Sequence, residues 1–324
     1  MWFYHDNQFN EIPNHIKQVK WGSIKMIYYL SIAKIWISTH TFPVWVYKNK
    51  NQFYLNTWHG GLGMKKIGLD SQDVLEKKEI SRMKHNSEMV DLFISNSKWL
   101  SDIYERAFWY KGIISVTGYP KDDYLLNIDK RIIKENVYRF FNLDSKTKIV
   151  LYAPTMREHP KEESFLNINR FIIQLNKKDR QNNWKILYRF HPVNADYASE
   201  IEEEENIINA TNYQDILNLI VASDFFITDY SSCIFDAALI GKKAVIYAND
   251  EDEYRKERGL YINLEELPFP VARNEEKLIN DIISFDYEEY KRRVKKYYEK
   301  VEYLADGKAT ERISDIVIKK IKEI

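Results

Sequence analysis

The chain has 324 residues, of which 44% are hydrophobic, and this length suits two domains better than one. Its 48 lysine and arginine residues balance its 48 aspartate and glutamate residues, so the net charge of zero gives no support for a general nucleic-acid-binding protein. A single cysteine, Cys233, excludes an internal disulfide framework and agrees with a reducing compartment.

No secretory signal or membrane-spanning segment stands out in the sequence. The most apolar early stretch, residues 24–37, contains Lys25 and Lys34 and is shorter than the ~20 apolar residues that a spanning helix needs. We therefore expect a cytoplasmic protein.

Apolar strands alternate with amphipathic helices through the first part of the chain. Strand patterns occur at residues 1–5, 19–23, 35–38, 53–58, 92–96 and 113–117, and helical patterns at residues 73–89 and 98–110. Such alternation is typical of a parallel sheet, so we predict one parallel α/β layer. Gly118, Tyr119 and Pro120 end this layer, and residues 128–141 read as a connecting helix.

A second set of strands begins near Ile149 and continues near Ile186, Ile207, Phe225 and Ala244. We therefore place a domain boundary at about residue 145, which gives domains 1–145 and 146–324. Three helices without intervening strands follow at residues 274–284, 287–303 and 308–321. The middle one is basic and amphipathic, so it either lies on anionic lipid at the inner membrane face or packs on its own domain.

The end of the strand at residue 225 combines features that suit a phosphate. The apolar run stops before Asp229, and Ser231 and Ser232 open a helix that Gly241 ends before the next strand. The segment therefore predicts a βαβ crossover whose helix start attracts anions. Alternatively, the two serines only cap the helix.

Three further strand ends deliver histidine, arginine or hydroxyl groups. They carry His59 with Gly60, Thr155 with Arg157, and Arg189 with His191. Because ligands of open α/β sheets bind outside the carboxyl ends of the strands, we expect these side chains to converge. The other histidines, among them His40, are interpreted as structural or exposed.

At these residues the chain resembles the CDP-glycerol glycerophosphotransferase family, which includes teichoic acid primases and polymerases and capsule-synthesis relatives. The motifs follow one another along most of the chain: Thr57-Trp58-His59-Gly60 with Lys65-Lys66-Ile67-Gly68, Tyr152-Ala153-Pro154-Thr155 with Arg157, Arg189-Phe190-His191-Pro192, Thr228-Asp229-Tyr230-Ser231-Ser232, Glu253-Tyr254 with Glu257-Arg258-Gly259, and Asp306-Gly307-Lys308-Ala309 with Arg312.

The resemblance implies two Rossmann-like domains facing a cleft, the glycosyltransferase B architecture. Residues 1–145 would form the acceptor-side domain and residues 146–324 the CDP-polyol-binding domain, with the last helix crossing back to the first domain. Two features depart from the family pattern. Gly61 and Leu62 stand where many teichoic acid enzymes have Thr-Pro, and the chain begins almost at a strand, which is compatible with a shortened N-terminal domain.

The implied reaction transfers glycerol phosphate from CDP-glycerol, or a similar polyol phosphate from CDP-ribitol, to a hydroxyl of a lipid-linked teichoic acid or capsular acceptor, releasing CMP. No metal motif is present, and no cofactor is expected. The polyol, the acceptor, a primase or polymerase role and the oligomeric state stay open. So do two alternatives: a glycosyltransferase that uses a nucleotide sugar, and a degenerate nucleotide-binding module.

Roles for individual residues follow from this reaction. We predict two catalytic residues, His59 as the base and His191, and expect Gly60 to let the substrate approach closely. A turn in which His59 only bonds the backbone is the alternative.

The remaining predicted residues bind substrate. A pyrophosphate cradle is expected from Arg157, Arg189, His191, Ser231 and Ser232, beside Thr155. Asp229 is expected to orient His191 or bind a hydroxyl. Glu253 and Arg258 would hold the nucleotide ribose, unless they belong to an exposed salt-bridged loop.

Overall fold

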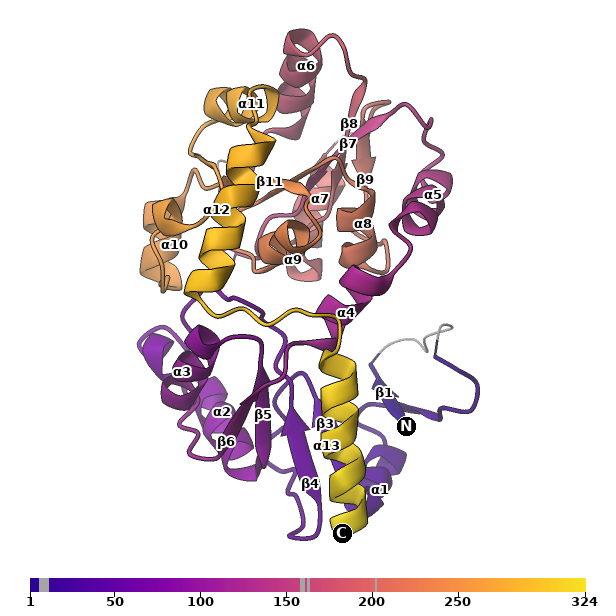
Figure 1. Cartoon of the computed structure of the whole chain (residues 1–324), viewed down its shortest axis with the longest axis vertical. Coiled ribbons are helices and arrows are strands. Elements are labelled where there is room, and N and C mark those ends of the chain that lie inside the picture. The colour runs from indigo at the N-terminus through magenta and orange to yellow at the C-terminus, as the bar shows by residue number, and fades with distance from the viewer. Residues whose placement is uncertain (6–11, 158–160, 162–163, 202) are drawn as a thin grey trace.

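The computed structural model describes residues 1–5, 12–157, 161, 164–201 and 203–324. Figure 1 shows an elongated molecule in which the first part of the chain forms one lobe and the middle part forms the other. Each lobe contains a parallel sheet with helices packed against it.

The first lobe is built on a four-stranded sheet in which all neighbours are parallel. Its strand order is β3 (Ile35–Ser38), β4 (Phe53–Asn56), β5 (Leu92–Ser95) and β6 (Ile113–Val116). Its helices are α1 (Ile24–Ile32), α2 (Lys77–Met89) and α3 (Lys98–Ala107), with a 3₁₀ turn at Gly68–Ser71. Every residue of β4 and β5 is buried, as expected for strands covered on both faces.

The prediction of a single layer is wrong for the first two strands. β1 (Trp2–Tyr4) and β2 (Gln18–Lys20) pair only with each other, in a separate two-stranded parallel sheet. Each has three residues, and Val19 is their one buried side chain, so they bury too little apolar surface for a place inside the main sheet. The small sheet is instead docked through Trp21, whose ring stacks on Phe42.

The second lobe contains a six-stranded sheet in the order β12–β11–β10–β7–β8–β9, again with parallel neighbours. The strands are β7 (Lys148–Tyr152), β8 (Trp184–Tyr188), β9 (Ile207–Asn209), β10 (Phe225–Thr228), β11 (Lys243–Tyr247) and β12 (Val271–Ala272). The helices are α6 (Ile168–Lys178), α7 (Ala195–Glu200), α8 (Ile216–Ala222), α9 (Cys233–Leu239), α10 (Glu251–Glu257) and α11 (Glu275–Ile283), with 3₁₀ turns at Pro192–Asn194 and Leu264–Glu266. The predicted crossover is present as β10–α9–β11.

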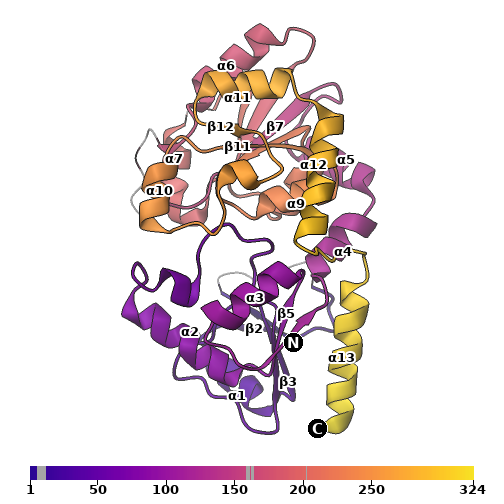
Figure 2. The same cartoon turned by 60° about the vertical axis from the view of Figure 1, so that its left-hand side comes forward.

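Two connections join the lobes. The chain passes from β6 to β7 through α4 (Pro120–Asn127) and α5 (Lys130–Phe140), so the predicted boundary falls between α5 and β7. After α12 (Tyr287–Lys300) the chain returns, and α13 (Ala309–Glu323) lies along the first lobe (Figures 1 and 2). Arg312 Nε donates to Thr117 O at 2.8 Å, and Ile313 belongs to the first core, so the last helix crosses back as expected.

Helix α12 packs on its own domain. Its apolar side chains Tyr290, Val294 and Tyr297 are buried in the second core, while its basic residues other than Arg293 are exposed. The apolar face is therefore already covered, which favours the packing interpretation over a helix lying on lipid. Within the described ranges, no helix combines the length and apolar character that crossing a membrane requires.

A short stretch of the first lobe enters the second. We call residues 60–66, which follow β4, the crossing segment. Leu62 and Met64 are each 1% exposed and belong to the core of the second lobe. Tyr261 N donates to Met64 O at 2.8 Å, so backbone bonds as well as burial hold the segment there. Gly68, just beyond it, has φ of 53°, and a Cβ there would lie 2.0 Å from Ala107 O, so only glycine fits.

Candidate functional site

A cavity of about 440 Å³ lies where the crossing segment meets the start of α9. Among the predicted residues, its wall contains the catalytic candidate and part of the predicted cradle: His59, Gly60, Ser231, Ser232 and Arg258. The first two come from the end of β4, and the others come from the second lobe. The cavity therefore brings together residues from both lobes at the carboxyl ends of their strands.

His59 has the tautomer that a base requires. Its Nδ1 lies 3.0 Å from Thr39 O, and because a carbonyl oxygen only accepts, Nδ1 carries the hydrogen. In the neutral ring Nε2 then holds a lone pair. Partial burial lowers the pKa of His59 below its usual 6.5, nearby Lys65 lowers it further, and the bond to Thr39 opposes both. The ring thus makes the backbone bond of the alternative interpretation and still lines the cavity.

His40 is part of the same wall, so its interpretation as merely structural or exposed was too narrow. Its ring stacks on His59 at 4.6 Å with an interplanar angle of 13°. Trp58 lies on His59 at 4.4 Å and has φ of 52°, an uncommon value for a bulky residue. His40 follows β3, so the strand-end rule used for the other residues would have found it.

The two serines differ in what their hydroxyls do. Ser231 Oγ accepts a bond from Cys233 N at 3.3 Å, which is a weak cap. Ser232 is the N-cap residue of α9, but its side chain makes no capping hydrogen bond. The capping alternative therefore fits Ser231 and does not fit Ser232.

Arg157 is buried and ion-paired, so its predicted place in the phosphate cradle stays a prediction. It is 3% exposed, and its guanidinium donates to Asp229 Oδ2 at 2.8 Å and to Asp250 at 2.8 and 3.1 Å. A further bond runs from Nη1 to Thr155 O at 2.8 Å. Arg157 is not among the described residues that line the cavity, and its charge is already matched by two carboxylates.

Asp229 and Thr155 belong to this buried network as well. The Asp229 carboxylate accepts from the backbone N–H groups of Thr155, at 2.8 Å, and Tyr230, at 2.6 Å, besides Arg157. In the described part of the chain it makes no bond to His191, so the expected orienting role is not seen. The Thr155 hydroxyl is buried and has no described hydrogen-bond partner.

Arg189 and His191 lie outside the described wall of the cavity. The Arg189 guanidinium donates to the backbone carbonyls of Ala210 and Tyr213, which occupies Nη1. His191 Nδ1 accepts from Val193 N at 3.2 Å, so the neutral ring carries its hydrogen on Nε2 and can donate it. Partial burial lowers the pKa of His191, and the charge of Lys65 lowers it further. Because Lys65 lines the cavity, the His191 ring lies close enough to the cavity to be affected by its charges.

Glu253 is exposed and salt-bridged, as in the alternative interpretation, but it lies in α10 and not in a loop. It pairs with Lys161 at 2.7 Å, a bond that lowers the pKa of the carboxyl. Arg258, predicted beside it, does line the cavity. Of these two predicted residues, Glu253 therefore lies on the surface and Arg258 lies in the cavity wall.

Lys65 is the main residue that the sequence analysis did not assign. It lines the cavity, and its charge lowers the pKa of both His59 and His191. Its motif, Lys65-Lys66-Ile67-Gly68, was part of the resemblance, but a lysine in a loop gives no further signal of its role. Within the described ranges, no group of three or more His, Cys, Asp or Glu side chains is arranged to hold a metal ion.

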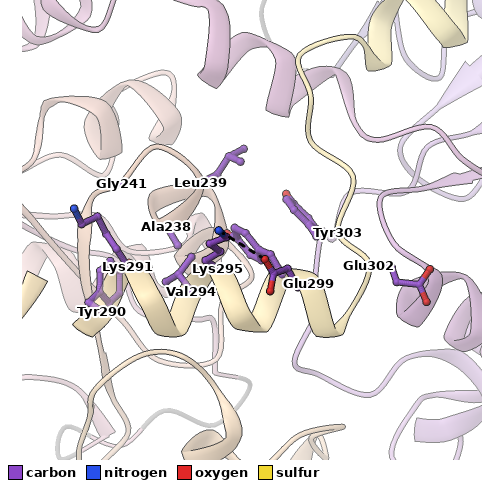
Figure 3. Close-up of a pocket in the computed structure, with 11 residues that line it drawn as sticks. Ala238, Leu239, Gly241, Tyr290, Lys291, Val294, Lys295, Glu299, Glu302 and Tyr303 are labelled. Carbon is purple, nitrogen blue, oxygen red and sulfur yellow. Dashed lines mark ion pairs between the residues drawn. The ribbon is translucent and has the colours of Figure 1, made fainter. Parts of the chain in front are cut away.

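A second cavity, of about 470 Å³, lies between the end of α9 and α12 (Figure 3). Tyr290, Lys291, Lys295 and Glu299 contribute to its wall, and Lys295 pairs with Glu299 at 4.0 Å. It contains no residue predicted for the site. We therefore take the cavity at the crossing segment as the candidate active site.

The chain is similar to known proteins over nearly its whole length. Residues 1–319 match the family described as CDP-Glycerol:Poly(glycerophosphate) glycerophosphotransferase. A teichoic acid glycerol-phosphate transferase of Staphylococcus aureus is 32% identical over 92% of this chain and 79% of the relative. A teichoic acid poly(glycerol phosphate) polymerase of Staphylococcus epidermidis is 30% identical over 100% of this chain, which spans 46% of that polymerase.

Solved structures give the same result. The wall teichoic acid polymerase TagF superposes with a TM-score of 0.81 at 28% identity, covering 95% of this chain and 77% of TagF. A histidine-to-asparagine variant of TagF soaked with CDPG superposes with a TM-score of 0.85 at 27% identity, covering 99% and 81%. These matches confirm the expected pair of Rossmann-like domains of glycosyltransferase B type. The chain belongs to the CDP-glycerol:poly(glycerophosphate) glycerophosphotransferase family.

Proposed function

We propose that this protein transfers glycerol phosphate from CDP-glycerol to a hydroxyl of a teichoic acid or capsular acceptor and releases CMP. One observation carries the proposal: the cavity joins His59 of the first lobe to Ser231, Ser232 and Arg258 of the second. A transferase of this kind needs a base at the acceptor and donors at the phosphates, and here the two sets come from different lobes. The relatives named for glycerol-phosphate transfer support the same reaction.

The reaction can be followed through the residues of the cavity. Nε2 of His59 takes the proton of the acceptor hydroxyl, and the oxygen attacks the phosphorus that carries glycerol. The bond from this phosphorus to the CMP oxygen breaks, and CMP leaves with the electron pair. The hydroxyls of Ser231 and Ser232 and the Arg258 guanidinium hold the diphosphate while its leaving oxygen gains charge.

His191 supports the departure of CMP in this proposal. Its Nδ1 is occupied as an acceptor, so its Nε2–H is the group that can donate to the leaving phosphate. His59 belongs to the first lobe, so we assign residues 1–145 to the acceptor side. The proposed phosphate-binding residues belong to the second lobe, so we assign residues 146–324 to the donor side. We assign no metal or other cofactor to the reaction, so activity should persist in a chelator.

A lipid-linked acceptor would bring the protein to the inner membrane face, and α1 offers a surface for this contact. Ile24 is 86% exposed, and Ile27, Tyr28 and Ile32 of the same helix are each at least half exposed. Their spacing places them on one side of α1, in contrast to the covered apolar face of α12. Replacing Ile24 and Ile27 by glutamate should reduce sedimentation with anionic vesicles; unchanged sedimentation would remove α1 from this role.

Release of CMP tests the proposed reaction. Purified protein is incubated with CDP-glycerol or CDP-ribitol and a lipid-linked saccharide or polyol-phosphate acceptor, with the His59→Asn variant as the matched control. Acceptor-dependent CMP release by the wild type supports the proposal. Consumption of a UDP-sugar instead would favour the glycosyltransferase alternative, and nucleotide binding without turnover would favour a degenerate module.

A further inference from the structure

The backbone fixes Lys65 between the two lobes. It forms an antiparallel bridge with Leu260, and the neighbouring Lys66 N donates to Gly259 O at 3.1 Å. The buried side chains of Leu62 and Met64 hold the crossing segment on the same side. Lys65 therefore comes from the acceptor-side lobe but lies against the donor-side lobe.

The Lys65 ammonium has no partner in the described part of the chain. No described residue forms a hydrogen bond or an ion pair with its Nζ, although its side chain is partly buried in the cavity wall. Burial lowers the pKa of Lys65, and Arg258 lowers it further, so the surroundings disfavour its charge. A desolvated cation without a partner costs free energy that a bound anion would offset.

Asp229 is the carboxylate whose charge acts on Lys65, but it does not serve as its counterion. Asp229 is bound by Arg157 at 2.8 Å and by two backbone N–H groups. Lys65 and Arg258 line this wall together with the hydroxyls of Ser231 and Ser232. A tetrahedral oxyanion matches this set of donors, because an ammonium supplies up to three hydrogen bonds and each hydroxyl one more.

We propose that Lys65 binds a substrate phosphate directly, so that the phosphate site is completed by a residue from the opposite lobe. The inference rests on the proposed function for the identity of the phosphate. Two sources share this chemistry: the diphosphate of the donor and the phosphodiester of a polyol-phosphate acceptor. The position beside Ser231 and Arg258 places Lys65 nearer to the donor groups, and the experiment separates the two sources.

The test compares Lys65→Met, which keeps the length of the side chain and removes its charge, with Lys65→Arg and with Lys111→Met. Lys111 is exposed and lies outside the described cavity wall, so its loss controls for net charge. Calorimetry measures binding of inorganic pyrophosphate, CDP, cytidine and a glycerol phosphate oligomer. Loss of one charge-assisted bond should weaken phosphate binding about 10- to 100-fold, with cytidine binding unchanged.

The ligands identify the source of the phosphate. Weaker binding of pyrophosphate and CDP in Lys65→Met assigns the site to the donor, while weaker binding of the glycerol phosphate oligomer alone assigns it to the acceptor. Wild-type affinity for all three phosphate ligands in Lys65→Met overturns the inference. If the wild type turns over no CDP-polyol and yet binds pyrophosphate through Lys65, the proposed reaction is wrong and the phosphate site stands.

A pH profile separates phosphate binding from a structural role. Lys65 lowers the pKa of His59, so Lys65→Met should move the acid limb of kcat/KM to higher pH, and Lys65→Arg should leave it in place. Thermal unfolding checks that the variant is folded, because the segment is held by Leu62, Met64 and the backbone. An unshifted acid limb together with intact phosphate affinity would show that Lys65 only supports the segment.

Discussion

Removing the imidazole of His59 should stop most of the transfer while the donor still binds. In the proposed reaction His59 takes the proton of the acceptor hydroxyl, so His59→Asn should lower kcat by ~10²- to 10⁴-fold. The affinity for CDP-glycerol should stay near that of the wild type, because the proposed donor-binding groups belong to the other lobe. Near-normal turnover in this variant would remove His59 from the mechanism.

The pH dependence of activity should reflect the environment of His59. Burial lowers its pKa below 6.5, so the neutral, proton-accepting ring should persist below the pH at which a free histidine becomes charged. The acid limb of kcat/KM is therefore expected below pH 6.5. A limb well above this value would show that a different group serves as the base.

Arg157 should matter for stability rather than for phosphate affinity. In Arg157→Met the carboxylates of Asp229 and Asp250 lose their buried counterion, which typically costs ~3–5 kcal/mol. Urea unfolding measures this loss, and Lys111→Met serves as a charge-matched control. Unchanged stability combined with weaker CDP-glycerol binding would return Arg157 to the phosphate cradle.

The sequence predicted that residues after β4 and β10 lie close together, but not which way the side chains after the other strands turn. His59, Ser231 and Ser232 line the cavity as expected, while Arg157 turns inward to Asp250. That partner lies 93 positions away in the chain, and no local pattern shows such a pairing. Lys65 was missed for the reverse reason: its position depends on a segment that is anchored in the other lobe.

At the level of elements, we expect different effects from replacing each of the two serines at the start of α9. Ser232→Ala should weaken CDP-glycerol binding at unchanged stability, because its hydroxyl makes no cap. The expected loss is ~0.5–1.5 kcal/mol for one hydroxyl bonded to phosphate. Ser231→Ala should also lower the melting temperature, since its Oγ accepts from Cys233 N. Lower stability with unchanged CDP-glycerol affinity in both variants would show that the two serines only cap the helix.

Strands with a continuous apolar run were predictable, and the shortest strand was not. The strands at residues 225–228 and 243–247 are fully or almost fully buried, so their apolar runs and turns marked them clearly. β12 has two residues, which is too short for an apolar pattern to be recognised in the sequence. No helix was predicted at α4, because Pro120 was taken to end the preceding layer, but proline also suits the first turn of a helix.

At the scale of the whole molecule, the lobes meet at a buried charge cluster. Lys121 of α4 pairs with Asp236 of α9, and it lies 3.6 Å from Asp122 Oδ1. Asp122 is fully buried, and this burial raises its pKa to about 6 from 3.8, although Lys121 opposes the shift. Tyr303, in the segment that returns to the first lobe, donates to the same carboxylate at 3.0 Å.

This cluster predicts a pH dependence of stability with a definite sign. Because the folded pKa of Asp122 is raised, its favourable contribution is complete below pH 3.8 and is lost as the pH rises through about 6. Asp122→Asn removes this titration, so its stability relative to the wild type should increase between pH 4 and pH 7. Urea unfolding at pH 4, 5 and 7 measures the difference. A constant difference would show that Asp122 does not titrate in this range.

A structure with bound CDP-glycerol would show whether donor and acceptor groups meet in the cavity between the lobes. We expect the diphosphate to contact Ser231, Ser232 and Arg258, with the glycerol-bearing phosphorus facing His59. Binding of the nucleotide elsewhere, for example in the cavity between α9 and α12, would contradict it.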